Sequence, residues 1–295
     1  MPHNLAPLRN LDVNREPWKG NCPKKPWEYE VTAVIPVIDT VEPLSVCVEI
    51  LRMQTVRPYI LVIDTGSEQE NLREILSMHD SDLEVHCIRL NGSRHPSDSV
   101  CMAMDLAQSL CRTEYMFATH SDVFLRRRDF IEDLLSVCGD QDGKFPVVGY
   151  EMSPRSHDDW RGMISHTASM YHIRTLDRIG FGWSMRRLAS MYGLESHEPS
   201  PERPNWPDTE ILGNMILRQH GVRTKIIGSE SNFQRNKDEN IDHCRSMSLG
   251  MLYSKVYYEK AEPWIKEAIF EAKERIKSWK TNKGKHERVS KQQDI

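Results

Sequence analysis

The stretch from Glu30 to Val37 reads EVTAVIPV, and nearly all of its residues are apolar or β-branched. An unbroken apolar run of this length is typical of a strand that is buried on both faces, whereas a half-exposed strand alternates between polar and apolar residues. Strands buried on both faces occur in parallel sheets that are covered by helices. The stretch therefore predicts an α/β protein.

The chain then alternates between helix-like and strand-like segments as far as residue 118. Helices are predicted where apolar residues recur at spacings of three and four, and strands where short apolar runs stand between turn residues. Strict alternation with short loops predicts a mostly parallel sheet with right-handed crossovers. The predicted helices are Pro43–Gln54, Glu68–His79 and Ser97–Cys111, and the strands are Tyr59–Ile63, Leu83–Leu90 and Glu114–Ala118.

The alternation is less regular after Phe124. The segment Glu151–Pro207 is predicted to be rich in loops. An apolar stripe along Pro263–Lys280 predicts an amphipathic helix that begins at Pro263, and the polar tail from Thr281 is expected to fray. The other predicted elements are the helices Asp129–Cys138 and Asp208–His220 and the strands Pro146–Tyr150 and Val222–Ile227.

The composition is that of a globular protein. Of the 295 residues 39% are hydrophobic and 28% are charged, and the formal net charge is −4. These values exclude a wholly disordered chain and a surface that is entirely basic for nucleic acid. No run approaches the ~18 apolar residues of a membrane span, and the N-terminus lacks the apolar core of a secretory signal. The seven cysteines include no CxxC pair, which favours free thiols in a reducing, cytoplasmic environment. We therefore expect a cytoplasmic protein without an integral membrane segment.

Ligands of open parallel sheets bind beyond the carboxyl ends of the strands, so the loops at these ends are candidate sites. One loop reads Ile63-Asp64-Thr65-Gly66-Ser67, in which Asp64 ends a strand and is expected to expose its carboxylate. That carboxylate could accept hydrogen bonds from a base or a ribose. The simpler interpretation is an ordinary turn into the next helix, with Ser67 as the N-cap.

A second loop, Thr119-His120-Ser121-Asp122, follows the apolar strand that ends at Ala118. His120 and Asp122 stand at alternating positions, so both side chains can point the same way. A hard cation that bridges a diphosphate needs a carboxylate at such a place. The simpler interpretation is a capped turn before the next helix.

A third motif, Trp206-Pro207-Asp208-Thr209-Glu210, opens a predicted helix. A carboxylate held here at the mouth of a cleft could act as a general base. Asp208 or Thr209 could instead cap the helix and take no part in catalysis.

In their order and spacing, these motifs resemble those of the inverting family 2 glycosyltransferases of the GT-A fold, over roughly residues 30–230. The resemblance implies a Rossmann-like, mostly parallel mixed sheet flanked by helices, with the C-terminal amphipathic helix added. The segments that resemble family motifs are Val31–Pro36 (the opening strand), Ile63–Ser67 (the nucleotide-contacting Asp turn), His120–Asp122 (the Asp-x-Asp metal motif), Leu176–Phe181 (an acceptor-side segment) and Pro207–Glu210 (the Glu-Asp motif).

The resemblance implies that a sugar is transferred with inversion from a nucleotide sugar, with a UDP-sugar favoured. Pro36 and Asp39 would border the base, and Asp64 would contact uracil or ribose. Asp208 would be the catalytic base that takes the proton from the acceptor hydroxyl. The remaining residues of the nucleotide-sugar site would be Ser67, Arg94 and Ser121.

The resemblance also implies a metal ion, Mn²⁺ or Mg²⁺, on the sugar-nucleotide diphosphate. Asp122 would hold it, with His120 and His243 as further ligands. His243 stands in a polar segment and could equally be a surface histidine. The implied division of the chain is an N-terminal arm (1–28), a nucleotide-sugar half (29–122), an acceptor half (123–250), and a C-terminal helix with a polar tail (251–295).

The sequence departs from the family pattern at three places. His120 replaces the first acidic residue of the metal motif, and Pro207 stands where the family has Glu. The helix Ser97–Cys111 lacks the family's usual Ala-Arg-Asn, and Arg94 would supply the phosphate-binding charge instead. Two rival functions therefore stay open: a nucleotidyltransferase that acts on a sugar phosphate, and an inactive nucleotide-sugar-binding protein. The acceptor also stays open among saccharide, lipid-linked sugar, protein and modified nucleic-acid base, as does the oligomeric state.

Overall fold

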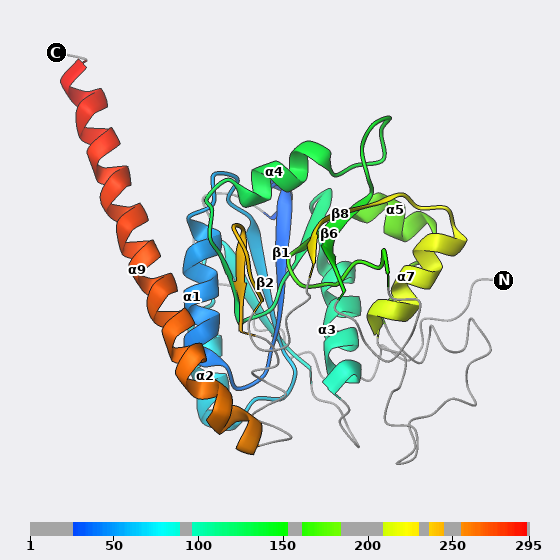
Figure 1. Cartoon of the computed structure of the whole chain (residues 1–295), viewed down its shortest axis with the longest axis horizontal. Coiled ribbons are helices and arrows are strands. Elements are labelled where there is room, and N and C mark those ends of the chain that lie inside the picture. The colour runs from blue at the N-terminus through cyan, green and yellow to red at the C-terminus, as the bar shows by residue number, and fades with distance from the viewer. Residues whose placement is uncertain are drawn as a thin grey trace.

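A seven-stranded sheet with helices on both faces forms the centre of the molecule (Figure 1). A computed structural model of the chain describes residues 26–88, 96–152, 161–183, 209–229, 236–244 and 255–293. The strand order is β3-β2-β1-β4-β7-β6-β8. The strands are β1 (Val31–Val37), β2 (Tyr59–Asp64), β3 (Leu83–Cys87), β4 (Tyr115–Ala118), β6 (Val147–Glu151), β7 (Ser169–His172) and β8 (Thr224–Ser229).

The sheet is mixed but mostly parallel. β1 pairs in parallel with β2 and β4, β2 with β3, and β6 with β8. β7 alone runs antiparallel to both of its neighbours, β4 and β6. This arrangement confirms the predicted fold class, a mostly parallel mixed sheet flanked by helices with a further helix at the C-terminus.

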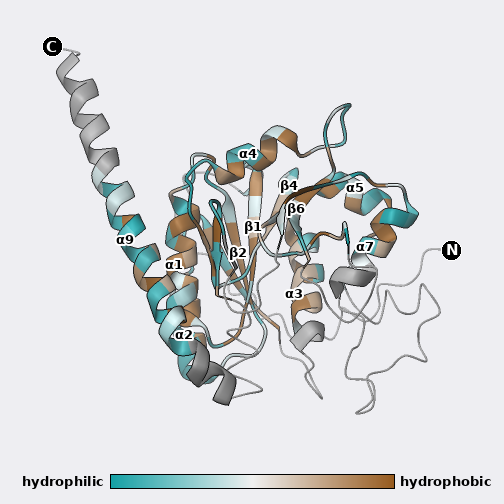
Figure 2. Ribbon diagram, in the orientation of Figure 1, coloured by the Kyte–Doolittle hydropathy of each residue, from teal (hydrophilic) through white to brown (hydrophobic). Residues whose placement is uncertain are grey.

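The burial of β1 explains why its sequence is apolar throughout. All seven of its residues are buried, and Val31, Ala33 and Ile35 join the core on one face of the sheet while Val34 joins the core on the other. Figure 2 shows hydrophobic residues concentrated in the central strands. One face is covered by α1 (Val41–Arg52), α2 (Gln69–Ser77), α4 (Phe130–Val137) and α9 (Lys255–Gln293), and the other by α3 (Pro96–Leu110), α5 (Ile173–Arg178) and α7 (Thr209–Gln219).

A second, smaller sheet was not anticipated by the sequence analysis. It joins β5 (Val123–Leu125), β10 (Ile241–His243) and β9 (Asn236–Lys237) in antiparallel pairs, in the order β5-β10-β9. Strands of two or three residues are too short to show a periodic pattern. The remaining described element is a 3-10 helix at Pro26–Glu28, at the end of the segment predicted to be an N-terminal arm.

The predicted loop-rich segment Glu151–Pro207 also contains two short elements that the sequence did not reveal, β7 and α5. The sequence of β7, SMYH, lacks a strand-like apolar run, and β7 joins the sheet by pairing with both β4 and β6. Two predictions about the C-terminal helix were wrong. The C-terminal helix begins at Lys255 rather than Pro263, and it continues past Thr281 to Gln293. Pro263 therefore lies inside the helix, where it donates no backbone hydrogen bond.

The amphipathic stripe predicted for the C-terminal helix is confirmed. Ile265, Ala268 and Ile269 are buried in the core that α9 shares with α1. Two ion pairs flank this contact, Lys273 Nζ with Glu42 Oε1 at 2.6 Å and Lys280 Nζ with Glu49 Oε2 at 2.8 Å. In Figure 1 the last turns of α9 extend beyond the other elements. No helix among the described residues combines the length and the apolarity needed to cross a membrane.

The thiol prediction holds for the described cysteines. Six of the seven lie among the described residues and form no disulfide, and Cys22 lies outside the described residues. The six are Cys47, Cys87, Cys101, Cys111, Cys138 and Cys244.

Replacement of Ile269 by Ala should lower the free energy of unfolding by ~2–4 kcal/mol, because it opens a cavity between α9 and the core. Ile269 is 7% exposed, whereas the next residue, Phe270, is 64% exposed and provides a matched control. Phe270→Ala should change stability by no more than ~0.5 kcal/mol. Urea unfolding followed by circular dichroism measures both, and equal effects of the two variants would contradict the docking of this helix face.

Candidate functional site

The loops that follow β1 and β2 are joined by hydrogen bonds at the carboxyl edge of the sheet. The backbone N–H of Thr65 donates to the carbonyl oxygen of Val37 at 2.9 Å, and the backbone N–H of Asp39 donates to Ser67 Oγ at 2.8 Å. Asp39 Oδ1 in turn accepts hydrogen bonds from Glu68 N at 2.7 Å and from the side chain of Asn71. Asp39 thus caps the start of α2 from a neighbouring loop, and Ser67 fixes the backbone of Asp39.

The carboxylate of Asp64 lies inside its own turn. It accepts hydrogen bonds from the backbone N–H groups of Gly66 and Ser67, each at 3.2 Å, and Gly66 has the positive φ of 124° that the tight turn requires. Asp64 is 0% exposed, so the expectation of an exposed carboxylate was wrong. Ser67 is not the N-cap of α2 either, because α2 begins at Gln69 with Glu68 in the N-cap position. Contact of Asp64 with a nucleotide stays a prediction.

The loop after β4 is joined to the loop after β1. Thr40 Oγ1 and Ser121 Oγ share a hydrogen bond of 2.7 Å, and both residues are buried. Cys47 Sγ on α1 donates to the carbonyl oxygen of His120 at 3.6 Å. Burial, and after it the negative charge of Asp122, raises the pKa of the Cys47 thiol above its usual range. The loops after β1, β2 and β4 therefore form one connected edge of the sheet.

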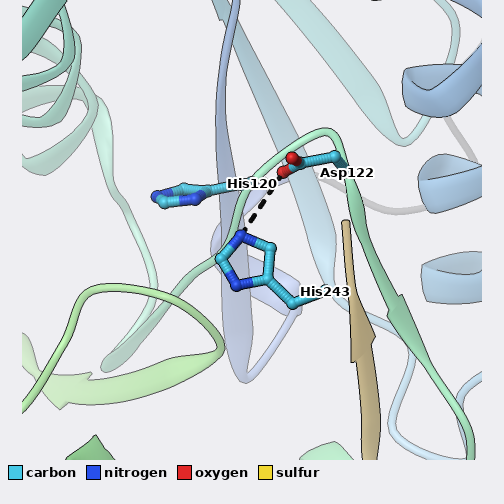
Figure 3. A group of neighbouring side chains, drawn as sticks. All are labelled: His120, Asp122 and His243. Atoms are coloured by element: carbon cyan, nitrogen blue, oxygen red, sulfur yellow. Dashed lines mark ion pairs between the residues drawn. The ribbon is translucent and has the colours of Figure 1, made fainter. Parts of the chain in front are cut away.

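Three potential metal ligands meet at this edge. His120, Asp122 and His243 each offer a ligand atom, and these atoms all lie within 4.8 Å of one another. The side chains face the same space in Figure 3, and His243 Nε2 lies 3.7 Å from Asp122 Oδ1. Asp122 and His243 are each 5% exposed. The sequence motif at residues 120–122 thus forms a site together with His243. This histidine lies 121 positions after Asp122 in the chain.

The pairing of β5 with β10 places His243 beside Asp122. His243 is the register partner of Val123, and the backbone N–H of Cys244 donates to the carbonyl oxygen of Asp122 at 3.0 Å. The start of β10 is fixed from the main sheet, because Tyr150 Oη on β6 donates to Asp238 Oδ2 at 2.6 Å. The other carboxylate oxygen, Asp238 Oδ1, accepts from the backbone N–H groups of Asn240 and Ile241, both at 2.8 Å.

The arginine run that follows the metal motif also supports β10. Arg126 donates its backbone N–H to the carbonyl oxygen of Asn240 at 2.7 Å, and Arg127 Nη1 donates to Asn240 Oδ1 at 3.1 Å. Arg127 also forms ion pairs with Asp129 and Asp133 at the start of α4. These contacts connect the loop after β5 with the loop before β10, on the side of the small sheet away from the metal ligands.

His166 is a site residue that the sequence analysis missed. Its ring centroid lies 4.7 Å from that of His120 and 6.4 Å from that of Trp183. His166 precedes β7, a strand that the sequence pattern did not reveal, so nothing in the sequence indicated that it would reach this edge. Because β7 is antiparallel to β4, with Ser169 opposite Ala118, the start of β7 lies where β4 ends.

A small aromatic pocket continues from His166 toward α7. Two hydrogen bonds to α3 hold Trp183 there. Its backbone N–H donates to Asp105 Oδ1 at 2.6 Å, and its side-chain Nε1 donates to Gln108 Oε1 at 2.9 Å. The pocket is lined by Ile164, His166, Tyr171, Phe181, Trp183, Gly213, Asn214 and Leu217.

The other predicted site residues are placed as follows. Pro36 is buried within β1, opposite Ile63 of β2. Arg94 and Asp208 lie outside the described residues. The chemistry of the three converging ligands fits a divalent cation, because neutral imidazoles and a carboxylate are established donors for such ions.

A scan of protein-family models and a search of curated proteins each gave no match. Among solved structures, the chain is similar to the mannosyltransferase PcManGT from Pyrobaculum calidifontis in complex with GDP-Man and Mn²⁺, with 14% identity, 88% of this chain and 77% of that chain covered, and a TM-score of 0.47. It is also similar to S. aureus TarS, with 11% identity, 79% and 41% covered, and a TM-score of 0.45. For S. aureus TarS 1–349 the identity is 10%, the coverage 82% and 71%, and the TM-score 0.44.

Replacement of Asp39 by Ala should lower the free energy of unfolding by ~1–2 kcal/mol, because α2 loses the acceptor at its first turn. Asp39 also has a φ of 56°, a conformation that Asn tolerates better than Ala. Asp39→Asn keeps an acceptor oxygen and should lose less. Thermal unfolding measures the stability of both variants, and Glu70→Ala on the exposed side of α2 is the control. Equal destabilisation by Asp39→Asn and Asp39→Ala would contradict the capping role.

Proposed function

We propose that this chain is a metal-assisted glycosyltransferase that moves a sugar from a nucleotide sugar, with a UDP-sugar favoured, to an acceptor hydroxyl with inversion. The observation that carries the proposal is the meeting of His120, Asp122 and His243 at the carboxyl edge of the sheet. In open sheets of this type ligands bind at that edge. The loops after β1 and β2 lie at the same edge and would receive the nucleotide.

His120, Asp122 and His243 would hold Mn²⁺ or Mg²⁺. When bound, the ion would supply positive charge that offsets the charge growing on the leaving diphosphate. The nucleotide would be bound by residues of the half that spans 29–122, and the acceptor by the half that spans 123–250. The proposed nucleotide-sugar residues are Pro36, Asp39, Asp64, Ser67, Arg94 and Ser121.

Asp208 would take the proton from the acceptor hydroxyl as it attacks the sugar. It immediately precedes α7, whose position is fixed relative to the site by Asn214. Asn214 Oδ1 accepts from the backbone N–H of Ile164 and Asn214 Nδ2 donates to the carbonyl oxygen of Ile164, both at 2.8 Å. Ile164 lies two residues before His166. These two hydrogen bonds therefore support the proposal that α7 begins near His120, Asp122 and His243.

A panel of nucleotide sugars with Mn²⁺ tests the proposal against its two rivals. Saturation at ~100 Kd stabilises a protein by ~2.7 kcal/mol, so a true donor should raise the melting temperature clearly. Product analysis then separates the functions. A glycosyltransferase releases a nucleoside diphosphate by transfer or slow hydrolysis, a nucleotidyltransferase makes or consumes pyrophosphate, and an inactive binding protein releases neither product.

Replacement of Asp122 by Ala should abolish the divalent-dependent part of nucleotide affinity, because it removes the only carboxylate of the three-residue ligand set. Titration calorimetry with UDP in the presence and absence of Mn²⁺ measures this. Asp142→Ala, which changes an exposed aspartate in the loop before β6, is the matched control. Unchanged Mn²⁺ dependence in Asp122→Ala would exclude this metal assignment.

Replacement of Asp208 by Asn should lower turnover by ~10²–10⁴-fold, the usual contribution of a general base. Nucleotide-sugar affinity should survive, because the predicted role of Asp208 is toward the acceptor. Turnover is measured with the donor identified by the panel. A fully active Asp208→Asn enzyme would remove the assignment of the base.

A further inference from the structure

The rings of His166 and His243 both lie against that of His120, although His166 is not in the three-residue ligand set. The ring centroids of His120 and His243 are 5.7 Å apart with an interplanar angle of 67°. Those of His120 and His166 are 4.7 Å apart with an interplanar angle of 62°. His120 thus meets each of the other two rings edge-on, and the three come from separate elements: the loop after β4, the loop before β7, and β10.

These separations are the ones expected of imidazoles that share one metal ion. A ring nitrogen at ~2.1 Å from the ion places the ring centre ~3.2 Å away, so two bound rings lie ~4.5 Å apart at a right angle and ~5.5 Å apart at 120°. The observed separations of 4.7 and 5.7 Å lie close to these two values. Rings that only pack edge to face have the same separations and angles, as Tyr171 and Trp183 do at 5.1 Å and 78°, so the Zn²⁺ experiments below distinguish ligation from packing.

His166 is also held firmly in place. It is 9% exposed, and its backbone loop is closed by Ser169 Oγ, which donates to the carbonyl oxygen of Ser165 at 2.6 Å. Within the same loop Thr167 N donates to Ser165 Oγ at 3.1 Å, and Ala168 has a φ of 52°, which is unfavourable for a residue with a Cβ. Backbone strain that the surroundings enforce is a recurrent feature of functional sites. The loop therefore presents His166 to His120 at a conformational cost.

We propose that His166 is a fourth metal ligand, so that the ion is held by three imidazoles and one carboxylate. This inference rests on the proposed metal role of His120, Asp122 and His243. His166 is not one of the residues whose ligand atoms lie within 4.8 Å of one another, so its ring would have to turn toward the ion to join the set. A six-coordinate ion would keep two positions open for the diphosphate of the donor.

A set so rich in nitrogen has a consequence for the choice of metal. Imidazole donors suit Zn²⁺ and similar transition-metal ions, whereas Mg²⁺ prefers oxygen ligands and water. The site should therefore bind Zn²⁺ or Mn²⁺ in the presence of excess Mg²⁺. This departs from an all-carboxylate site, which would accept Mg²⁺ readily.

Titration of the chelator-treated full chain with Zn²⁺ alone, followed by calorimetry, tests the fourth ligand. His166→Ala and His243→Ala should each weaken Zn²⁺ binding by at least ~10–100-fold, while His220→Ala, which removes an exposed histidine at the end of α7, should not change it. Melting curves without metal establish that each variant is folded. His166→Asn provides a second variant if the Ala variant is unstable.

X-ray absorption of the Zn²⁺-loaded wild-type chain decides the matter without any substitution, because it counts the imidazoles around the ion. Three imidazoles, together with the loss in His166→Ala, establish the proposal. Two imidazoles, or a loss confined to His243→Ala, overturn the role of His166 and leave the proposed metal-assisted function standing. Failure of the wild-type chain to bind any of Zn²⁺, Mn²⁺ and Mg²⁺ overturns both, whereas binding of Mg²⁺ alone overturns only the role of His166.

Discussion

The short ladder between β5 and β10 is the constraint on which the candidate site depends. It pairs Val123 with His243, two residues separated by most of the second half of the chain, and so brings a histidine to Asp122. Closing so long a loop has an entropic cost that three residue pairs cannot offset alone. The ladder is stabilised from outside, by Tyr150 on the main sheet through Asp238 and by Arg275 on α9, which donates to the carbonyl oxygen of Leu125 at 3.0 Å.

The same edge of the main sheet is stabilised by side chains that sequence analysis assigned to ligand binding. Those side chains are Asp39, Ser67 and Ser121, which bond to one another, to neighbouring backbone or to Thr40, and so connect the loops after β1, β2 and β4. A nucleotide that bound here would meet a prearranged surface, in which loop ordering is already complete. Binding then loses less conformational entropy than it would on independent loops. Structural and binding roles are therefore compatible for these residues.

The first half of the fold could be predicted because its signals are local. β1 is an unbroken apolar run of strand length and α1 repeats apolar residues at helical spacing, so the types of both elements follow from the sequence. The pairing of β10 with β5 left no such signal, because a three-residue strand has no period and its partner lies far along the chain. His243 was therefore implied only by a family resemblance, and His166 was missed. The burial of Asp64 also escaped prediction, because it depends on which groups its turn folds over.

Backbone strain marks the same edge independently of any side-chain chemistry. Among the described residues other than glycine, only Asp39 and Ala168 have a positive φ, of 56° and 52°. One follows β1 and the other precedes β7, so both lie where the loops of the candidate site meet. Asp39 is compensated by its hydrogen bonds to α2, whereas Ala168 gains no such bond from its methyl side chain. A glycine at position 168 would relieve the strain, so the loop keeps its conformation through the hydrogen bonds of Ser165 with Thr167 and Ser169 and not through the preference of Ala168. The same loop carries His166, whose ring centroid lies 4.7 Å from that of His120.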